Sequence, residues 1–323
     1  MRAKQKAAAI AARKGSATKQ LSERVFMPGE DGQVLRNLVM EVRKAELLVV
    51  LSSYLLQDGP LVDALLERAS AGVFVAVLTA ASEDLETLAD DELSLFDQRV
   101  LEDHGRMLDR MAGHILVRTS RAYHAKFLLV DPQSVHAFGV LQTCNMTLDA
   151  LTGKNIEAGV VLRPDEILSI YSLFLHGFWN QAQHELLSAG VLSSAASGPA
   201  LDLGTVSLPA TYGSSCSLKE SVVSIISAAQ QRIDISCWTF LHPAIAELLY
   251  ARVASGIAVN LYVHIPEFPT EMIDQLAAGG VMVYGHPRLH AKTVIADRTY
   301  GLLMTANVAE FGMDTGFEAG VFL

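Results

Sequence analysis

Short apolar runs alternate with helix-like stretches along this chain, and the whole alternation occurs twice. An apolar run at residues 47–51 precedes a turn with Pro60, a stretch of helical periodicity, and a second apolar run at residues 73–78. The same order returns at residues 233–235, Pro243 and residues 257–263. Strands that alternate with helices are typical of α/β folds with a largely parallel or mixed sheet. The pattern therefore predicts an α/β fold with helices flanking each sheet.

The two regions also match residue by residue. A shift of 184 residues superimposes five pairs without a gap: Ser52 and Ser236, Tyr54 and Trp238, Leu65 and Leu249, Arg68 and Arg252, and Gly72 and Gly256. A repeat of this length is the size of a domain, so it predicts two similar lobes and not a solenoid. We expect a pseudo-twofold axis between the lobes, because such an axis would bring equivalent surfaces together in one cleft.

Length and composition suit two lobes joined by a linker. The chain has 323 residues, 50% of them hydrophobic, which is enough for about two domains with sizeable cores. A stretch rich in Ser, Ala, Gly and Pro separates the two halves of the repeat. We predict a basic N-terminal arm at residues 1–33, a first lobe at 34–187, a linker at 188–210 and a second lobe at 211–323.

Charge is unevenly distributed along the chain. Residues 1–24 contain seven basic residues and one acidic residue, so they carry +6, whereas the whole chain carries −10. Nine acidic residues lie within residues 83–103, and this run has no equivalent in the second lobe. We interpret the run as a solvated helical insertion. The alternative is an acidic lid, or a mimic that blocks a phosphate-binding cleft.

Cysteine usage and hydropathy bear on the compartment. The three cysteines, Cys144, Cys216 and Cys237, have no paired spacing, which suits a reducing compartment. No cluster of Cys and His has the spacing of a zinc site, so we expect no metal. No apolar run approaches the roughly 20 residues that span a bilayer, and the N-terminus lacks the apolar centre of a secretory signal. These features predict a cytoplasmic protein without an integral membrane span.

One short motif occurs once in each half. Residues 124–131 read HAKFLLVD and residues 290–297 read HAKTVIAD. Each motif is followed by a threonine two residues before an asparagine, and then by a glutamate within EAGV. The two series are His124, Lys126, Asp131, Thr143, Asn145 and Glu157, and His290, Lys292, Asp297, Thr305, Asn307 and Glu318. The complete series, in the same order twice, indicates an active site rather than two surface pairs.

The two series resemble those of the phospholipase D superfamily, in particular its members with two His-Lys-Asp motifs in one chain. The resemblance covers most of residues 40–323. It implies two phospholipase D-like lobes and a phosphodiesterase that needs no metal or other cofactor. Both copies have threonine where the family usually has serine, and Gln142 and Met304 stand where glycine is usual. The first copy also has four more residues between its Asp and its Asn than the second.

Two histidines suit the cleavage of a phosphodiester. A neutral imidazole can attack phosphorus and hold it covalently, which splits one difficult step into two. A second imidazole can protonate the leaving oxygen and then deprotonate water. The unperturbed pKa of about 6.5 lies near working pH for both roles, and two close histidines can titrate as a coupled pair. The resemblance favours His124 as the nucleophile, through a phosphohistidine, and His290 as the acid and base.

Positive and neutral donors accompany the histidines, and we expect them to bind the non-bridging oxygens of the phosphate. These donors are Lys126, Lys292, Asn145, Asn307, Thr143 and Thr305. Glu157 and Glu318 are the expected partners of the far ring nitrogens of the histidines, where a carboxylate fixes the tautomer. The matched aromatic residues Tyr54 and Trp238 suit either the lining of the cleft or the core.

Two further pairs of residues accompany the motifs. Asp131 and Asp297 end apolar strands, and we assign them a structural role, either strand-end hydrogen bonds or a salt bridge across the lobes. Arg121 and Arg288 precede the histidines by two or three residues. A contact with substrate phosphate and a solvated strand end are both compatible with these arginines.

A nucleic acid, DNA or RNA, is the substrate that we favour. A compact chain with a basic N-terminal arm suits a nuclease, and bacterial members of the superfamily without membrane segments resemble nucleases, some of them in phage defence. The net charge of −10 opposes this interpretation unless charge is segregated. One alternative is a phospholipase D or a phosphatidyltransferase like cardiolipin synthase, with the basic N-terminus on an anionic membrane. Another is a regulated subunit of a larger nucleic-acid-processing complex.

The two halves differ after the EAGV sequence. A helical stretch follows the first copy, whereas three residues at most follow the second. We therefore expect an exposed apolar patch beside the last strand, unless the N-terminal arm or a protein partner covers it. Because both motifs lie in one chain, a monomer can build the site, and a homodimer is equally compatible with the sequence.

Overall fold

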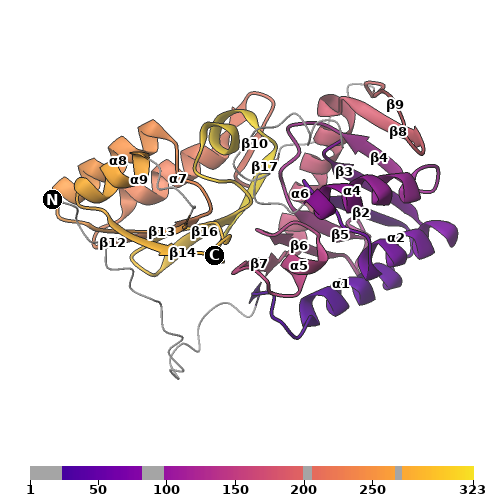
Figure 1. The fold of residues 1–323 in the computed structure, drawn as a ribbon, viewed down its shortest axis with the longest axis horizontal. Coiled ribbons are helices and arrows are strands. Elements are labelled where there is room, and N and C mark those ends of the chain that lie inside the picture. The colour runs from indigo at the N-terminus through magenta and orange to yellow at the C-terminus, as the bar shows by residue number, and fades with distance from the viewer. Residues whose placement is uncertain (1–23, 82–97, 199–205, 266–270) are drawn as a thin grey trace.

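The chain folds into two α/β lobes that lie side by side. A computed structural model describes residues 24–81, 98–198, 206–265 and 271–323. The first lobe lies at the right of Figure 1 and the second at the left, each with one mixed sheet and its helices. The predicted fold class of two similar α/β lobes is therefore confirmed. Residues 1–23 of the expected arm and most of the acidic run lie outside the described residues.

The first lobe is built on one mixed sheet. Its described strands follow the order β1-β7-β6-β5-β2-β3-β4-β8-β9, in which β2, β3 and β4 are parallel neighbours and the remaining pairs are antiparallel. The strands are β1 (Val25–Phe26), β2 (Leu48–Ser52), β3 (Phe74–Thr79), β4 (Leu116–Thr119), β5 (Phe127–Val130), β6 (Phe138–Gln142), β7 (Gly159–Val161), β8 (His184–Ser188) and β9 (Val191–Ser194). The helices are α1 (Gln33–Lys44), α2 (Pro60–Ser70), α4 (Gln98–Met111), α5 (Leu148–Leu151), α6 (Pro164–His176) and the π-helix η2 (Gly177–Gln181).

The second lobe repeats the plan with fewer strands. Its described strands follow the order β11-β10-β17-β16-β15-β12-β13-β14, in which β12, β13 and β14 are parallel neighbours. The strands are β10 (Ala210–Tyr212), β11 (Ser215–Cys216), β12 (Arg232–Cys237), β13 (Ala258–His264), β14 (Met282–His286), β15 (Thr293–Ala296), β16 (Tyr300–Met304) and β17 (Glu318–Phe322). The helices are α7 (Ser217–Ala228), α8 (Pro243–Ala254), α9 (Glu271–Ala278) and the π-helix η3 (Phe311–Thr315).

The repeated sequence forms the same unit in both lobes, β2–α2–β3 and β12–α8–β13. Parallel strands need a long crossover, which a helix supplies in each lobe. A proline begins both helices, where its missing N–H leaves no helical hydrogen bond unmade. Leu48 lies opposite Phe74 in the first sheet, and Arg232 lies opposite Ala258 in the second. These two pairs are related by the same shift of 184 residues, so the repeat extends to the strand register.

Asp131 and Asp297 tie the end of one strand to the beginning of another. Asp131 follows β5 and accepts three hydrogen bonds of 2.8 Å from consecutive backbone N–H groups that lead into β2. Asp297 follows β15 and accepts three of 2.8–2.9 Å from the backbone that leads into β12. Both residues have a left-handed backbone, with φ of 45° and 53°. Such backbone costs energy, which the three hydrogen bonds offset.

The lobe boundaries differ from those predicted. Val25 and Phe26, in the expected arm, form β1 and pair with β7 at one edge of the first sheet. At the other edge β8 pairs with β4 and β9 pairs with β8, so the sheet extends to Ser194, inside the expected linker. These strands are two to five residues long, too short for an alternation of polar and apolar residues to reveal them.

Helices cover the first sheet on both faces and the second sheet only in part. The helices α1, α2 and α4 pack on one face of the first sheet, and α6 packs on the other. In the second lobe, α7, α8 and α9 all lie on one side of the sheet, the upper side in Figure 1. The helix α6 also reaches the second lobe, because Ile170 and Phe174 share an apolar cluster with Ala319 and Val321 of β17.

The last strand is buried, contrary to the prediction of an exposed apolar patch beside it. Ala319 and Val321 have no exposed surface. The helical stretch that follows the first EAGV is α6, and its position between the lobes lets it cover β17 as well as its own sheet. Neither the N-terminal arm nor a partner is needed to cover this strand.

Candidate active site

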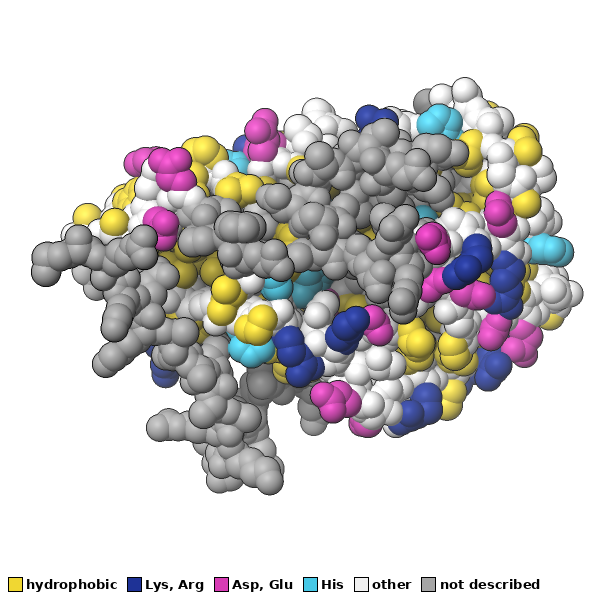
Figure 2. All heavy atoms as spheres, in the orientation of Figure 1, with side chains coloured by type: hydrophobic (Ala, Val, Ile, Leu, Met, Phe, Trp, Pro, Cys, Tyr) yellow, Lys and Arg dark blue, Asp and Glu magenta, His cyan; other side chains and the backbone are white. Residues whose placement is uncertain are grey.

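The two His-x-Lys segments meet where the lobes join. Each segment immediately precedes a strand, β5 in the first lobe and β15 in the second. Isolated parallel bridges join Tyr123 to Phe317 and Ile156 to Leu289. Each bridge links the residue before the histidine of one lobe to the residue before the glutamate of the other. These equivalent contacts are what a pseudo-twofold axis produces, and they bring the two half-sites together. Figure 2 shows histidine side chains near the middle of one face, between the lobes.

Each histidine contacts a glutamate of the opposite lobe. His124 Nδ1 lies 2.6 Å from Glu318 Oε1, and His290 Nδ1 lies 2.6 Å from Glu157 Oε1. All four side chains are buried. The pairing therefore runs between the lobes and not within each lobe. A carboxylate at Nδ1 favours the tautomer with its proton on that nitrogen, which places the lone pair on Nε2.

The threonines bind these same glutamates. Thr143 Oγ1 donates to Glu157 Oε2 at 2.5 Å, and Thr305 Oγ1 donates to Glu318 Oε2. Burial alone would raise the pKa of Glu157, but His290 together with neighbouring donors outweighs burial and lowers that pKa. Each threonine hydroxyl has only one proton to donate. In this structure the proton is directed to the glutamate and not toward a substrate phosphate.

Both lysines of the series are completely buried beside the histidines. Lys126 Nζ donates to the backbone oxygen of His124 at 2.7 Å. Lys292 Nζ lies 3.1 Å from the backbone oxygen of His290 and 3.1 Å from its Nε2. A buried ammonium group needs hydrogen-bond acceptors or an anion nearby. Lys292 therefore places fixed positive charge against the His290 ring, and Lys126 places it at the backbone of His124.

The asparagines occupy equivalent positions after β6 and β16. Asn145 is buried, and its Oδ1 accepts a hydrogen bond of 3.3 Å from the backbone N–H of Leu55. Asn307 is half-buried at the corresponding place in the second lobe. The structure thus places all six His, Lys and Asn residues of the two series around the junction of the lobes.

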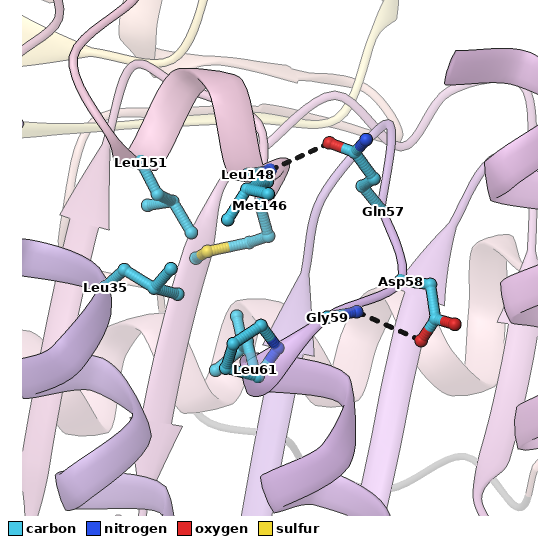
Figure 3. Close-up of a pocket in the computed structure, with 9 residues that line it drawn as sticks. Leu35, Gln57, Asp58, Gly59, Leu61, Met146, Leu148 and Leu151 are labelled. Carbon is cyan, nitrogen blue, oxygen red and sulfur yellow. Dashed lines mark hydrogen bonds between the residues drawn. The ribbon is translucent and has the colours of Figure 1, made fainter. Parts of the chain in front are cut away.

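A small apolar pocket lies behind the loop that carries Asn145, between α1, α2 and α5 (Figure 3). Met146, the next residue, points into it, and Gln57 Oε1 accepts a hydrogen bond of 2.9 Å from the backbone N–H of Leu148 at its rim. None of the predicted site residues lines the pocket. We assign it to the packing that supports this loop.

The two arginines have different surroundings. Arg121 is exposed, and its backbone N–H donates to Gln183 at 3.0 Å. The guanidinium of Arg288 donates to the backbone oxygens of Lys154, at 2.7 Å, and Gly153. Arg288 belongs to the second lobe and its acceptors to the first, so this contact joins the lobes.

Aromatic rings flank both histidines. The Tyr54 ring lies 5.5 Å from the His124 ring, and the Trp238 ring lies 6.3 Å from that of His290. The site also contains Phe311, whose ring lies 6.2 Å from His124 and which sequence reasoning missed. Phe311 lies four residues after Asn307, and the residue four positions after Asn145 is the polar Asp149. The repeat therefore contains no matched aromatic pair that could have predicted Phe311.

His264 is a further neighbour that the sequence did not indicate. Its ring lies 5.5 Å from Trp238. Burial, together with the charge of His290, lowers the pKa of His264. The two catalytic candidates therefore have unlike surroundings: two aromatic rings adjoin His124, whereas Trp238 and Lys292 adjoin His290.

A comparison with protein families supports the resemblance read from the motifs. The family model described as the PLD-like domain of cardiolipin synthase matches residues 222–323, which hold the whole second series. The first lobe repeats that series on the same strands. The second lobe is therefore similar to the PLD-like domains of the phospholipase D superfamily. A search of curated proteins found no match.

Solved structures of a synthase and a kinase share this fold. Phosphatidylserine synthase from Haemophilus influenzae Rd KW20 has a TM-score of 0.64 at 12% identity, over 93% of this chain and 82% of that one. Polyphosphate kinase from Porphyromonas gingivalis has a TM-score of 0.57 at 14% identity, over 90% of this chain. The chain spans only 43% of that kinase. Nuc from Salmonella typhimurium, a phospholipase D family member, has a TM-score of 0.33 at 20% identity, over 36% of this chain and 81% of that one.

Proposed function

We propose that the chain is a nuclease that cleaves a phosphodiester bond of DNA or RNA through a phosphohistidine. The observation that carries this proposal is the crossed pairing, in which two buried histidines each have Nδ1 2.6 Å from a carboxylate. A carboxylate there orients the ring, keeps the lone pair on Nε2 and stabilises the imidazolium when it forms. One such imidazole suits nucleophilic attack, and the other suits proton transfer.

The proposed reaction has two steps. In the first, Nε2 of His124 attacks phosphorus, the bond from phosphorus to the leaving oxygen breaks, and imidazolium His290 gives that oxygen its proton. In the second, neutral His290 takes a proton from water, the water oxygen attacks phosphorus, and the phosphorus–nitrogen bond breaks. His290 ends as imidazolium, ready for the next cycle. Glu318 and Glu157 hold the Nδ1 protons of the two rings throughout.

The charges around the site match one phosphodiester. The formal charges of Lys126 and Lys292 cancel those of Glu157 and Glu318. A single imidazolium then leaves the site with one positive charge, which equals the negative charge of one phosphodiester. In a buried site such charge acts at low effective dielectric and can stabilise the transition state strongly. Within this proposal the lysines, not a metal, bind the non-bridging oxygens.

The other residues of the series support this arrangement. We assign Thr143 and Thr305 to positioning, because each donates to a glutamate that contacts a histidine. Asn145 and Asn307 act as neutral donors to phosphate in the proposal. Arg288 joins the lobes through its contacts with first-lobe carbonyls.

Two features favour a nucleic acid over a lipid in this proposal. No helix in the described residues is long and apolar enough to cross a membrane. The three cysteines, Cys144, Cys216 and Cys237, are free thiols, as suits the reducing cytoplasm, where foreign nucleic acid would be met. Within this proposal, phage defence is a role that the enzyme could serve.

Phosphatidyl transfer is the second candidate. The matching family model is that of a cardiolipin synthase domain, and a phosphatidylserine synthase shares the fold over most of the chain. The same two steps would serve it, with an alcohol in place of water in the second step. Both candidates would use the same residues and differ in their substrate.

One experiment separates the candidates. The purified protein is incubated in EDTA with labelled single-stranded DNA, double-stranded DNA, RNA and a fluorescent phospholipid, the last with and without an acceptor alcohol. The His124→Ala variant is the control. Cleavage of nucleic acid that persists in EDTA and is lost in the variant would support the nuclease. Turnover of the phospholipid alone would replace it with the second candidate.

A further inference from the structure

One face of the second sheet carries aromatic and polar side chains, and no described helix lies over it. All described helices that pack on β12, β13 and β14 lie on the opposite side of the sheet (Figure 1). The side chains on this face are partly exposed. We call Trp238, Tyr262, His264, Tyr284 and His286 the aromatic face.

The repeat shows that this face differs in kind from its counterpart. The corresponding face of the first sheet is buried beneath α6. Three positions that are apolar and buried there are polar or carry a hydroxyl in the second lobe. The pairs are Val50 and Asp234, Ala76 and Asn260, and Leu78 and Tyr262. An apolar helix seated on the second face would remove charged and polar groups from water, which is costly. The face is therefore suited to a ligand that is itself both flat and polar.

The rings of the aromatic face form two neighbouring groups. Tyr262 and Tyr284 are stacked, with ring centroids 5.0 Å apart and planes inclined by 16°. Trp238 and His264 lie 5.5 Å apart, and His264 faces His286 across the strand pair. Rings held on adjacent strands lose little freedom when a planar ligand stacks on them.

Hydrogen bonds fix the position of the rings. The Tyr262 hydroxyl lies 3.4 Å from both Asp234 Oδ1 and Arg232 Nη2, and Arg232 forms a further ion pair of 2.6 Å with Asp234. Each of these groups has a partner within the face, so the rings are held before any ligand arrives.

The aromatic face is continuous with the proposed catalytic site. The Trp238 ring lies 6.3 Å from the His290 ring. Ser236, on the same face, shares a hydrogen bond of 2.8 Å with Thr293, the residue after Lys292. A polymer that lies along β12 and β13 thus ends beside the lysine and histidine of the second series.

We propose that the aromatic face binds single-stranded DNA or RNA by stacking its bases and leads the strand to the catalytic histidines. The inference rests on the proposed nuclease function and names the strandedness of its substrate. Every base has a π-face, so stacking on such rings tolerates any sequence. A duplex hides its base faces within the helix, and this surface would therefore discriminate against it.

The test measures binding apart from cleavage. Fluorescence anisotropy with labelled single-stranded DNA and RNA, and with the matching duplexes, uses protein in the His124→Ala background so that the probe stays intact. In that background Tyr284→Ala is expected to raise the Kd for single strands about tenfold, and Tyr284→Phe to restore it. The matched control is Tyr300→Ala, which removes a tyrosine stacked on Phe322, at 5.4 Å, from a strand outside the aromatic face.

The outcomes are separable. An unchanged Kd for Tyr284→Ala, or equal affinity of the parent for duplex and single strand, overturns the inference and leaves the face to a protein partner. If Tyr284→Ala does not fold, His286→Ala removes a ring from the neighbouring group and is scored in the same way. Oligonucleotide cleavage by protein with His124 intact is measured in parallel. If protein with His124 intact cleaves oligonucleotides and Tyr284→Ala binds single strands normally, only the role of the aromatic face is refuted. Turnover of phospholipid and not of nucleic acid refutes the proposed nuclease.

Discussion

Glu318 of the second lobe lies 2.6 Å from Nδ1 of His124 in the first lobe. The reciprocal contact of Glu157 with His290 has the same length. Each lobe thus supplies the carboxylate that orients the histidine of the other. If the lobes separated, each carboxylate would lose the histidine that it contacts. The catalytic arrangement therefore exists only when the lobes are docked.

The first prediction concerns this contact. Replacing Glu318 with Gln keeps the shape but removes the charge that stabilises imidazolium at His124 and fixes its tautomer. We expect kcat to fall roughly 10²- to 10⁴-fold, as when the carboxylate of a serine triad is neutralised. Steady-state cleavage measures it, with Glu310→Gln as an exposed control in the same lobe. Equal activity of the two variants would show that the carboxylate has no catalytic part.

The second prediction separates the roles of the histidines. In the His290→Asn variant, His124 can still attack a diester with a good leaving group, but no base activates water. We expect a covalent adduct on His124, seen by intact-mass spectrometry under neutral conditions, because acid cleaves phosphohistidine. The same treatment of His124→Asn should leave its mass unchanged. A fully active His290→Asn enzyme would end the shared-site mechanism.

The third prediction tests the threonine that anchors Glu157. Thr143→Val is nearly isosteric but leaves Glu157 Oε2 and the backbone N–H of Ala158 without the partner that they have now. Each buried polar group left unpaired costs roughly 1–3 kcal/mol, so the free energy of unfolding should fall by at least that much. Urea denaturation measures it, and Thr143→Ser should restore most of the loss. A stable Thr143→Val protein would mean that this hydrogen bond contributes little.

The fourth prediction concerns the strand end at Asp131. In Asp131→Asn one carboxamide oxygen faces three backbone N–H groups that two carboxylate oxygens now serve. We expect the free energy of unfolding to fall by roughly 1–3 kcal/mol, with normal activity per folded molecule. Asp149→Asn is the control, since that carboxylate is exposed and forms an ion pair with Lys154. Equal losses in the two variants would contradict this account.

The fifth prediction follows from a buried histidine outside the site. His104 is fully buried, its Nε2 lies 3.0 Å from Ala80 O, and burial lowers its pKa below 6.5. Below about pH 6.5 the unfolded chain binds a proton at this residue that the folded protein does not, so stability is lost as pH falls. The free energy of unfolding should drop as pH falls below about 6.5, by up to about 1.4 kcal/mol per pH unit from this group. His104→Gln should show a smaller drop, and an identical drop would exclude His104 as its source.

Local patterns and the repeat predicted most of the fold. The strand–helix–strand units follow from apolar periodicity, and the matched register of β2 with β3 and of β12 with β13 follows from the shift of 184 residues. The duplicated series also predicted which residues gather at the junction, since equivalent surfaces meet across a pseudo-twofold axis.

Contacts between unlike parts of the chain could not be predicted in this way. A repeat indicates which residues are equivalent but not which lobe supplies the partner, so the contact of His124 with Glu318 rather than Glu157 is visible only in three dimensions. Phe311 could not be predicted from the repeat, because the equivalent residue, Asp149, is polar and not aromatic. The burial of β17 depends on α6, a helix that belongs to the other half of the sequence.

The helix α6 covers a face of the first sheet but only part of the second, so the two sides of the candidate site differ. A site with true twofold symmetry would present two identical entrances, and a polymer could be threaded through it either way round with equal ease. Here Tyr54 and Phe311 adjoin His124, whereas Trp238, on the side of the second sheet that no described helix covers, adjoins His290. A polymer with two different ends would therefore meet different side chains on the two sides of the site. Under the proposed function, we therefore expect a nucleic-acid strand to bind in one preferred direction.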